Sequence, residues 1–164
     1  MQGSIVQVSV SRGGVPKRAI PQGDLGPLGI AGDHQAHPQF HGGPRQAVLL
    51  IANEAIAELV AQGFPLYPGA LGENITTQGV DHKQWRAGQR WRVGHAIVQL
   101  TKVRQPCRQL TPYGKGIQKA LFDADVDAGD WMSPKWGMSG FYASVVQPGI
   151  VSPGGAVVLL DQMA

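Results

Sequence analysis

The chain has 164 residues, of which 43% are hydrophobic and 15% are charged, a balance typical of a globular protein and unlike that of a disordered one. The formal net charge is only +3, and the fourteen Lys and Arg residues are scattered, so a DNA-binding stripe is not expected and nucleic acid is excluded as a partner. A single cysteine excludes an internal disulfide, and without a long apolar run or a signal-like N-terminus we expect a cytoplasmic protein with no membrane segment.

The length predicts one domain over residues 1–164. It begins with a strand at residues 4–10, where Val6, Val8 and Val10 alternate with polar side chains, as in a half-buried strand. Residues 21–44 are rich in Gly, Pro and His and lack periodicity. Because irregular segments of that length are usually functional, we interpret this one as a functional loop.

The next elements are a buried strand and a helix. Residues 46–51 are too short an apolar run for a helix, which favours a strand. Asn53 is expected to cap a helix that ends at Gly63. Residues 65–79 contain further Pro and Gly and are predicted to form a second loop.

The second half of the chain is predicted to be mainly strands. Residues 88–103 indicate a hairpin that turns at Gly94-His95, with Ile97, Gln99, Thr101 and Val103 alternating along its second strand. A loop, a short helix and two more strands follow, at residues 104–113, 115–123, 141–146 and 156–160. About six strands and two short helices predict a mixed, mostly antiparallel sheet curled into a barrel.

The single cysteine, Cys107, is the first candidate for chemistry. It follows a predicted strand, and the flanking cations of Arg104 and Arg108 favour the thiolate, which is the form that binds metals. A sulfur donor suits a soft or high-valent metal better than it suits magnesium or calcium. The alternative is inert packing, because free cysteines are among the most buried residues.

Two glycine-rich turns could hold an anion. Gly42 and Gly43, between His41 and Arg45, would let a backbone approach a ligand, and the guanidinium of Arg45 could pair with phosphate. Lys17 follows Gly13-Gly14 at a strand end, where its cation could also meet a phosphate. An ordinary turn and a solvated basic loop are the alternatives.

Glu73 and Asn74 supply a carboxylate and an amide that could hydrogen-bond to the edge of a pterin ring or could only fasten their own loop. The trio His34, His37 and His41 lacks the spacing of a zinc site. Phosphate-loop and dinucleotide-binding glycine patterns are absent as well.

The order of these strings along the chain resembles the MOSC family, the domain found at the C-terminus of molybdenum cofactor sulfurases and in small bacterial proteins. The matching strings are Gly29-Ile30-Ala31-Gly32-Asp33-His34, His41-Gly42-Gly43, Gly72-Glu73-Asn74-Ile75-Thr76, Arg104 with Pro106-Cys107, and Gly140-Phe141-Tyr142. The resemblance covers residues 4–161 and leaves little chain for another domain.

The resemblance implies a mainly β fold with a few short helices, built as a strongly bent, mostly antiparallel β-barrel. Its pocket would hold the molybdenum cofactor, a small anionic pterin (Mo-molybdopterin), with Cys107 as metal ligand and catalytic residue. Carried over by position, the cofactor-binding residues would be His41, Gly42, Gly43, Arg45, Glu73, Asn74, Arg104 and Cys107. Lys17 joins this expected set because its cation could meet a phosphate of the cofactor.

The sequence leaves three functions open. The protein could be an oxidoreductase that reduces N-hydroxylated compounds with electrons from a separate donor, since the chain has no further cysteines for an iron-sulfur cluster. It could instead carry the cofactor, or a persulfide on Cys107, to an accepting enzyme. In the third case no molybdenum is involved, and Cys107 is a reactive thiol or a zinc ligand.

Overall fold

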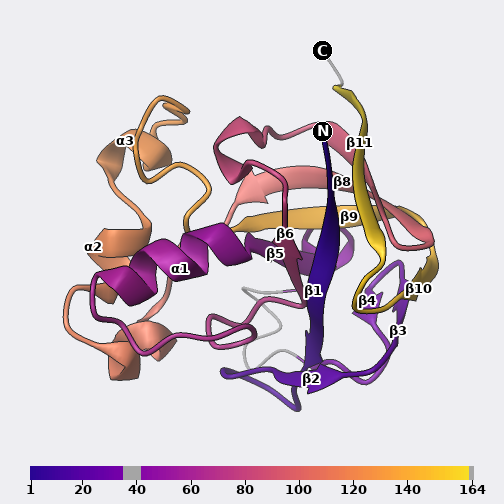
Figure 1. The fold of residues 1–164 in the computed structure, drawn as a ribbon, viewed down its shortest axis with the longest axis horizontal. Coiled ribbons are helices and arrows are strands. Elements are labelled where there is room, and N and C mark those ends of the chain that lie inside the picture. Colours follow the sequence, from indigo (N-terminus) through magenta and orange to yellow (C-terminus); the bar gives the residue numbers. More distant parts are fainter. Residues whose placement is uncertain (35–41, 163–164) are drawn as a thin grey trace.

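The computed structural model describes residues 1–34 and 42–162. Seven strands close into a barrel in the order β11-β7-β8-β9-β5-β6-β1, and β1 pairs back onto β11 (Figure 1). All neighbouring pairs are antiparallel except β5 and β6. The barrel strands are β1 (Gln2–Val10), β5 (Val48–Ala52), β6 (Ile75–Gln78), β7 (Gln89–Val93), β8 (Ala96–Val103), β9 (Phe141–Gln147) and β11 (Ala156–Gln162). The predicted fold class, a mostly antiparallel β-barrel, is therefore confirmed.

Short strands extend the barrel at one side. β2 (Arg18–Ile20) pairs with the end of β1, while β10 (Gly149–Val151), β3 (Gly23–Gly26) and β4 (Gly29–Ile30) form a small separate sheet. The expectation of one irregular loop over residues 21–44 is wrong in part, because β3 and β4 lie inside it. β6 likewise lies within the predicted loop 65–79.

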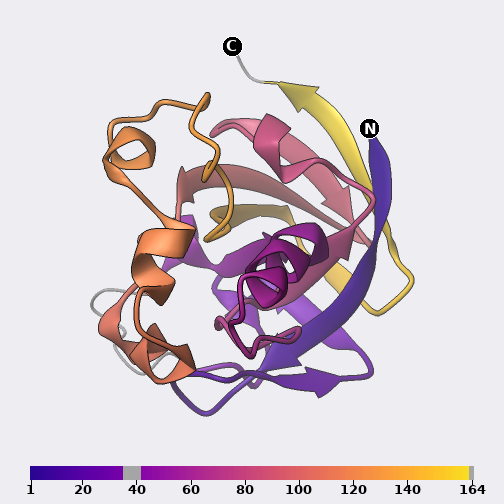
Figure 2. The same ribbon diagram turned by 60° about the vertical axis from the view of Figure 1, so that its left-hand side comes forward.

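Within residues 1–34 and 42–162, three α-helices and three 3₁₀ helices connect the strands. They are α1 (Asn53–Ala61), α2 (Ile117–Leu121), α3 (Ala124–Asp127), η1 (Pro44–Gln46), η2 (His82–Gln84) and η3 (Arg108–Tyr113). α1 packs on β5 and β6, and α2 and α3 lie together on the side opposite the small sheet (Figures 1 and 2). The predicted cap is wrong, because Ala52 occupies the N-cap position without a side-chain hydrogen bond and Asn53 is the first helical residue.

The barrel interior is filled by apolar side chains, including an aromatic cluster. Trp85 contacts Trp91 and Phe141 edge-on, with ring centroids 6.3 and 6.2 Å apart, and Trp136 contacts Phe141 at 5.7 Å. Edge-to-face pairs of this kind stabilise a core beyond the burial of their area. The cluster joins the loop that follows α3 to the barrel wall.

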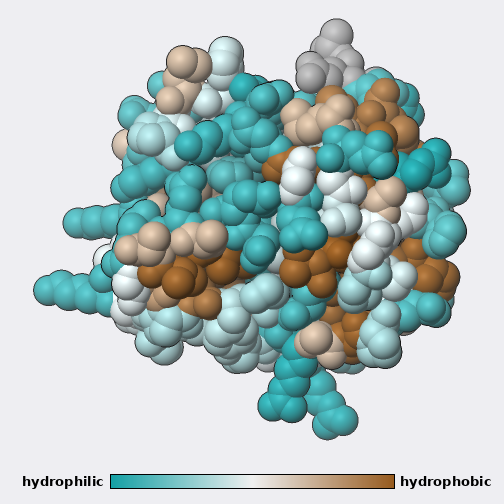
Figure 3. Space-filling model, in the orientation of Figure 1, coloured by the Kyte–Doolittle hydropathy of each residue, from teal (hydrophilic) through white to brown (hydrophobic). Residues whose placement is uncertain are grey.

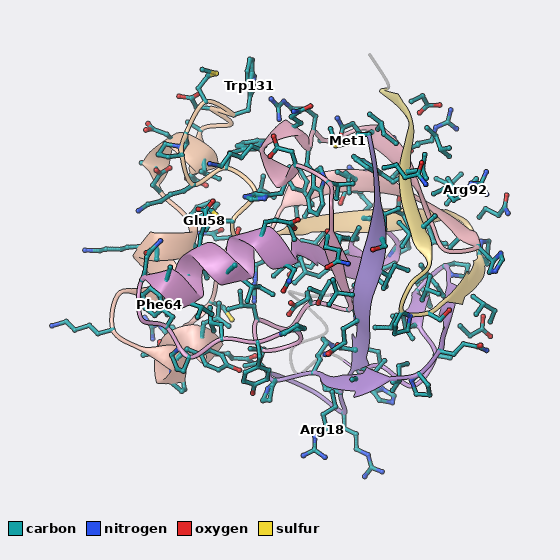
Figure 4. The ribbon with its side chains drawn as sticks, viewed as in Figure 1. Met1, Arg18, Glu58, Phe64, Arg92 and Trp131 are labelled. Carbon is teal, nitrogen blue, oxygen red and sulfur yellow. The ribbon has the colours of Figure 1, made fainter. Side chains whose placement is uncertain are left out.

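The surface in Figure 3 shows hydrophobic residues in separate groups between hydrophilic ones. Long charged side chains extend from this surface, among them Arg18, which points away from the body of the molecule (Figure 4). Among the described residues, no helix has the length and apolarity needed to cross a membrane.

The junction of β9 with β5 requires glycine at position 140. Gly140 has φ +89°, and a Cβ there would lie 2.4 Å from the Leu50 carbonyl oxygen and 2.5 Å from Ile51 Cγ1. We expect Gly140→Ala to lower the free energy of unfolding by at least about 2 kcal/mol, because backbone strain and a steric clash add. Urea unfolding would measure this loss.

Gly154→Ala is the matched control, since Gly154 has φ +86° but nothing within 4 Å of an added Cβ. It should cost only the backbone strain, about 1 kcal/mol. Equal losses in the two variants would show that the clash at Gly140 relaxes without cost.

Candidate functional site

The first cavity lies where the β1–β2 turn, the chain after β4, η1 and the chain after β8 converge. Its volume is about 530 Å³, counting the solvent at its mouth. Its walls bring together residues far apart in sequence: Gly14, Val15, Lys17, Asp33, Gly42, Gln46, Leu49, Gly72, Asn74, Arg104, Cys107, Gln109 and Tyr142. Charged side chains such as Lys17 and Arg104 stand in this wall beside apolar ones such as Leu49, a combination that is common in ligand pockets.

A buried hydrogen-bond network forms one side of the first cavity. Lys17 Nζ lies 2.6 Å from Asp33 Oδ1, and both side chains are at most 9% exposed. Asn74 Nδ2 donates to Asp33 Oδ2 at 2.9 Å and to the Ser9 carbonyl at 3.2 Å, while its Oδ1 accepts from the Leu49 N–H. The network pairs the buried charges and fixes the loop before β6 to β1 and β5.

Arg104 lies on another wall of the cavity and is only partly paired. Its residue is 4% exposed, and Nη2 donates to the Leu71 carbonyl at 2.8 Å. Within residues 1–34 and 42–162, neither Nε nor Nη1 has a hydrogen-bond partner. Because buried donors on a cation are costly when unpaired, this guanidinium is prepared for an anionic ligand.

Glu73 interacts with the charge of Arg104 but does not line the cavity. Its side chain is fully buried and does not line the wall. Thr76 Oγ1 donates to Oε2 at 3.3 Å, whereas Oε1 has no partner among the described residues. Burial raises the pKa of Glu73 from 4.5 to about 7, and the nearby Arg104 and backbone N–H groups partly offset the rise.

Cys107 separates the first cavity from a second one. Its side chain is half-buried, immediately before η3. The second cavity, about 1480 Å³ with its open mouth, lies between the chain after β8 and the segment from Phe122 to Trp136. Cys107, Gln46 and Tyr142 line both spaces, so Cys107 lies where the two cavities adjoin.

The structure gathers some of the residues predicted for the site and leaves others apart. Lys17, Gly42, Asn74, Arg104 and Cys107 all line the first cavity. Three do not: Gly43 and Arg45, which are exposed, and Glu73, which is buried. The remaining predicted residue, His41, lies outside the described part of the chain.

The sequence prediction missed Asp33, Gln109 and Tyr142 as members of the wall. Asp33 was the most accessible to prediction, because it ends a glycine-rich string ahead of the long loop. The pKa of the Tyr142 hydroxyl is raised, mainly by burial. No pattern in the sequence marks Gln109, since it lies in η3, within a segment that the sequence predicts only as a loop.

The zinc alternative gains no support from the described part of the chain. Within it, no three His, Cys, Asp or Glu side chains are grouped so that they could hold a metal ion. His34 is exposed, and the other two histidines of the predicted trio, His37 and His41, lie outside the described residues.

We expect Glu73→Gln to remove one pH dependence of stability. Because the pKa of the Glu73 carboxyl is raised to about 7 in the folded chain, the folded chain holds the carboxyl proton more tightly than the unfolded chain does. The stabilisation by the protonated carboxyl is therefore complete below about pH 4.5 and is lost as the pH rises through about 7. Between pH 5 and 8 the wild type should lose on the order of 1–3 kcal/mol relative to the variant.

Urea unfolding across this pH range measures the difference. Glu58→Gln removes an exposed carboxylate on α1 and controls for the lost negative charge (Figure 4). Parallel pH profiles for the wild type and Glu73→Gln would contradict the prediction.

The chain is similar to known proteins both in sequence and in fold, and both comparisons include a YiiM protein. A family model described as the MOSC domain matches residues 37–158. The chain is 32% identical over 134 residues to the uncharacterized protein YflK of Bacillus subtilis (strain 168) and 28% identical over 141 residues to protein YiiM of Escherichia coli (strain K12). These alignments cover 80% and 84% of this chain but only 55% and 58% of the relatives, so the chain spans little more than half their length.

A solved structure, YiiM from Geobacillus stearothermophilus, superposes with a TM-score of 0.72 at 25% identity. The match covers 97% of this chain and 75% of that structure. The barrel and the turns that converge on the first cavity therefore belong to a fold that has been solved before.

Proposed function

The chain belongs to the MOSC domain family, which is associated with molybdenum cofactor binding, and we propose that its first cavity binds this cofactor with Cys107 as the metal ligand. We further propose that the bound cofactor reduces N-hydroxylated compounds with electrons from a separate redox protein. Because the relatives are longer than this chain, their partners and substrates are not transferred to it.

One observation carries the proposal: a buried cation with unpaired donors shares a cavity with the only thiol of the chain. Arg104 keeps Nε and Nη1 free of partners within the described residues, and Cys107 lines the same wall. An anion bearing several oxygens would satisfy the guanidinium, and a metal would take the thiolate. A ligand that carries both an oxygen-bearing anion and a metal fits this arrangement better than a simple phosphate does.

Glycine at position 72 lets two walls of the cavity approach each other closely. Gly72 has φ +89°, and a Cβ there would lie 2.9 Å from Val15 Cγ1, in the lining of the cavity. Lys17 uses one of its donors on Asp33, which leaves its other ammonium hydrogens for a terminal phosphate. We propose that Gly42 and Arg104 complete the set of cofactor contacts.

Asn74 takes a different role from the one that the resemblance implies. Its amide hydrogens are engaged by Ser9 and Asp33, and its oxygen accepts from the Leu49 N–H. Both N–H donors of the side chain are therefore used within the protein, and its oxygen already accepts one hydrogen bond. We propose that it holds the cavity wall in place and that it does not hydrogen-bond to the pterin.

When bound, the cofactor would supply the exchange of two electrons in which R–NH–OH, two electrons and two protons give R–NH₂ and water. Cys107 would hold the reacting centre where both cavities meet, and the second cavity would admit the substrate. A carrier needs only the first cavity. The second one, adjoining the thiol, favours the reductase.

The proposal is tested by producing the protein in cells with and without an intact molybdopterin pathway. Bound molybdenum would be measured by elemental analysis, and the pterin by its fluorescent oxidation product. We expect both in protein from competent cells only. The proposal fails if both are absent from that protein and remain absent after incubation with isolated cofactor.

A further inference from the structure

We infer that the second cavity recognises a flat aromatic ring of the substrate and that Phe122 is a specificity-determining residue for this ring. The inference rests on the proposed function for the reacting group at Cys107, but the ring site itself is argued from the cavity walls.

The walls of the second cavity are mainly aromatic and aliphatic. Trp136, Phe141 and Tyr142 line it while being only 6%, 1% and 7% exposed, so each contributes the part of its surface that faces the cavity. Val103 and Val126 add aliphatic surface. Aromatic walls of this kind bind planar rings by stacking and edge contacts.

The two cavities differ in charge, which assigns different parts of a reaction to them. The first contains Lys17, Asp33 and Arg104, all buried or nearly so. In the second, the charged lining residues that the structure describes are Lys102 and Asp127, and both are exposed at its rim. A polar, anionic cofactor therefore suits the first space, and an aromatic substrate suits the second.

The position of Cys107 between the two cavities determines the orientation of such a substrate. Cys107 lies at the boundary of both cavities, so the group to be reduced would point toward the thiol. The ring would then extend along the aromatic walls, and rim groups of opposite charge, Lys102 and Asp127, would be available to polar edges of the ring system.

Among the aromatic residues of this wall, Phe122 can be substituted without disrupting the packing of the core. Trp136 is anchored by a 2.9 Å hydrogen bond from Nε1 to the Trp85 carbonyl, and it packs on Phe141 inside the barrel cluster. Phe122 lies between α2 and α3, half-buried and packed at the margin of the core. Its ring thus contributes more to the cavity wall than to the stability of the core.

The test uses cofactor-free full-length protein and the alkylation of Cys107 by iodoacetamide, followed by mass spectrometry. Because the chain has one cysteine, the rate reports on that thiol alone. The probes are benzamidoxime and cyclohexanecarboxamidoxime, which carry the same N–OH group on an aromatic and a saturated ring. We expect the aromatic probe to protect the thiol at a concentration about 3- to 10-fold lower.

Phe122→Leu keeps an apolar side chain but removes the ring, and it should reduce this preference at least about twofold. Phe64→Leu is the matched control, because Phe64 is also half-buried but lines neither cavity and lies beyond α1 (Figure 4). It should leave the preference unchanged, and circular dichroism would verify that both variants are folded.

Equal protection by the two probes, or an equal loss of preference in both variants, would overturn the inference. These readouts need no molybdenum, so they are independent of the proposed function. Protein that acquires the cofactor but shows no ring preference refutes only the ring site. A ring preference that depends on Phe122, in protein that never acquires molybdenum, refutes only the proposed function.

Discussion

Cys107→Ser should reduce the molybdenum bound per chain at least about tenfold in protein from cofactor-competent cells. A serine hydroxyl stays protonated near neutral pH and is a harder, weaker donor than a thiolate, so the protein would lose its bond to the metal. The fold should persist, because Cys107 is half-buried in an irregular turn and is absent from the hydrophobic core. Elemental analysis of the purified variant measures the loss.

Gln109→Ala is the control for this experiment, since Gln109 lines the same cavity without offering sulfur. It should keep most of the metal. A Cys107→Ser protein as fully occupied as the wild type would show that sulfur is not the ligand, and the cofactor would then be held through its pterin and phosphate alone.

The barrel could be predicted because apolar alternation and glycine-rich turns recur along the chain, but the face of individual strands could not. In β1 the pattern of Val6, Val8 and Val10 predicts one buried face, whereas Ile5 and Val8 are the strand's buried apolar residues. The pairing of β1 with β6 shifts between Ile5 and Gln7, as in a β-bulge. A bulge of one residue moves the following side chains to the other face, and the residues around this bulge do not predict its position.

The second strand of the hairpin shows the same limit. The turn at Gly94-His95 is confirmed, since β7 ends at Val93 and β8 begins at Ala96. Yet the buried side chains of β8 are Ala96, Val98 and Leu100, which alternate with Ile97, Gln99 and Thr101. Both faces carry apolar residues, so the alternation alone could not decide which of them points inward.

For the site, the sequence predicted several residues that line the first cavity, but it did not predict the contacts that hold them in place. Asp33 pairs with Lys17 across sixteen positions, and Asn74 reaches Asp33 across forty-one. Such separations depend on barrel closure and leave no trace in local spacing. Glu73 illustrates the converse, because it belongs to a matched string and yet is buried without lining the cavity.

Glu73 and Arg104 form a buried couple without a direct ion pair among the described residues. The guanidinium lowers the pKa of the carboxyl, yet burial dominates and keeps the pKa near 7. Near neutral pH the carboxyl is thus only partly ionised, and Glu73 compensates the positive charge of Arg104 incompletely. An anion in the first cavity would supply the rest of the compensation.

Arg104→Lys should therefore weaken the binding of isolated cofactor about 30- to 100-fold, or about 2–3 kcal/mol, although the positive charge is kept. An ammonium cannot hold the Leu71 carbonyl and at the same time present two fixed N–H groups to the cavity, as the planar guanidinium can. Equilibrium titration with cofactor isolated from a donor protein measures the affinity, and Arg108→Lys, at an exposed arginine that lines neither cavity, is the matched control. Equal affinity in the Arg104→Lys and Arg108→Lys proteins would mean that charge alone holds the anion and that the unpaired Nε and Nη1 donors do not face it.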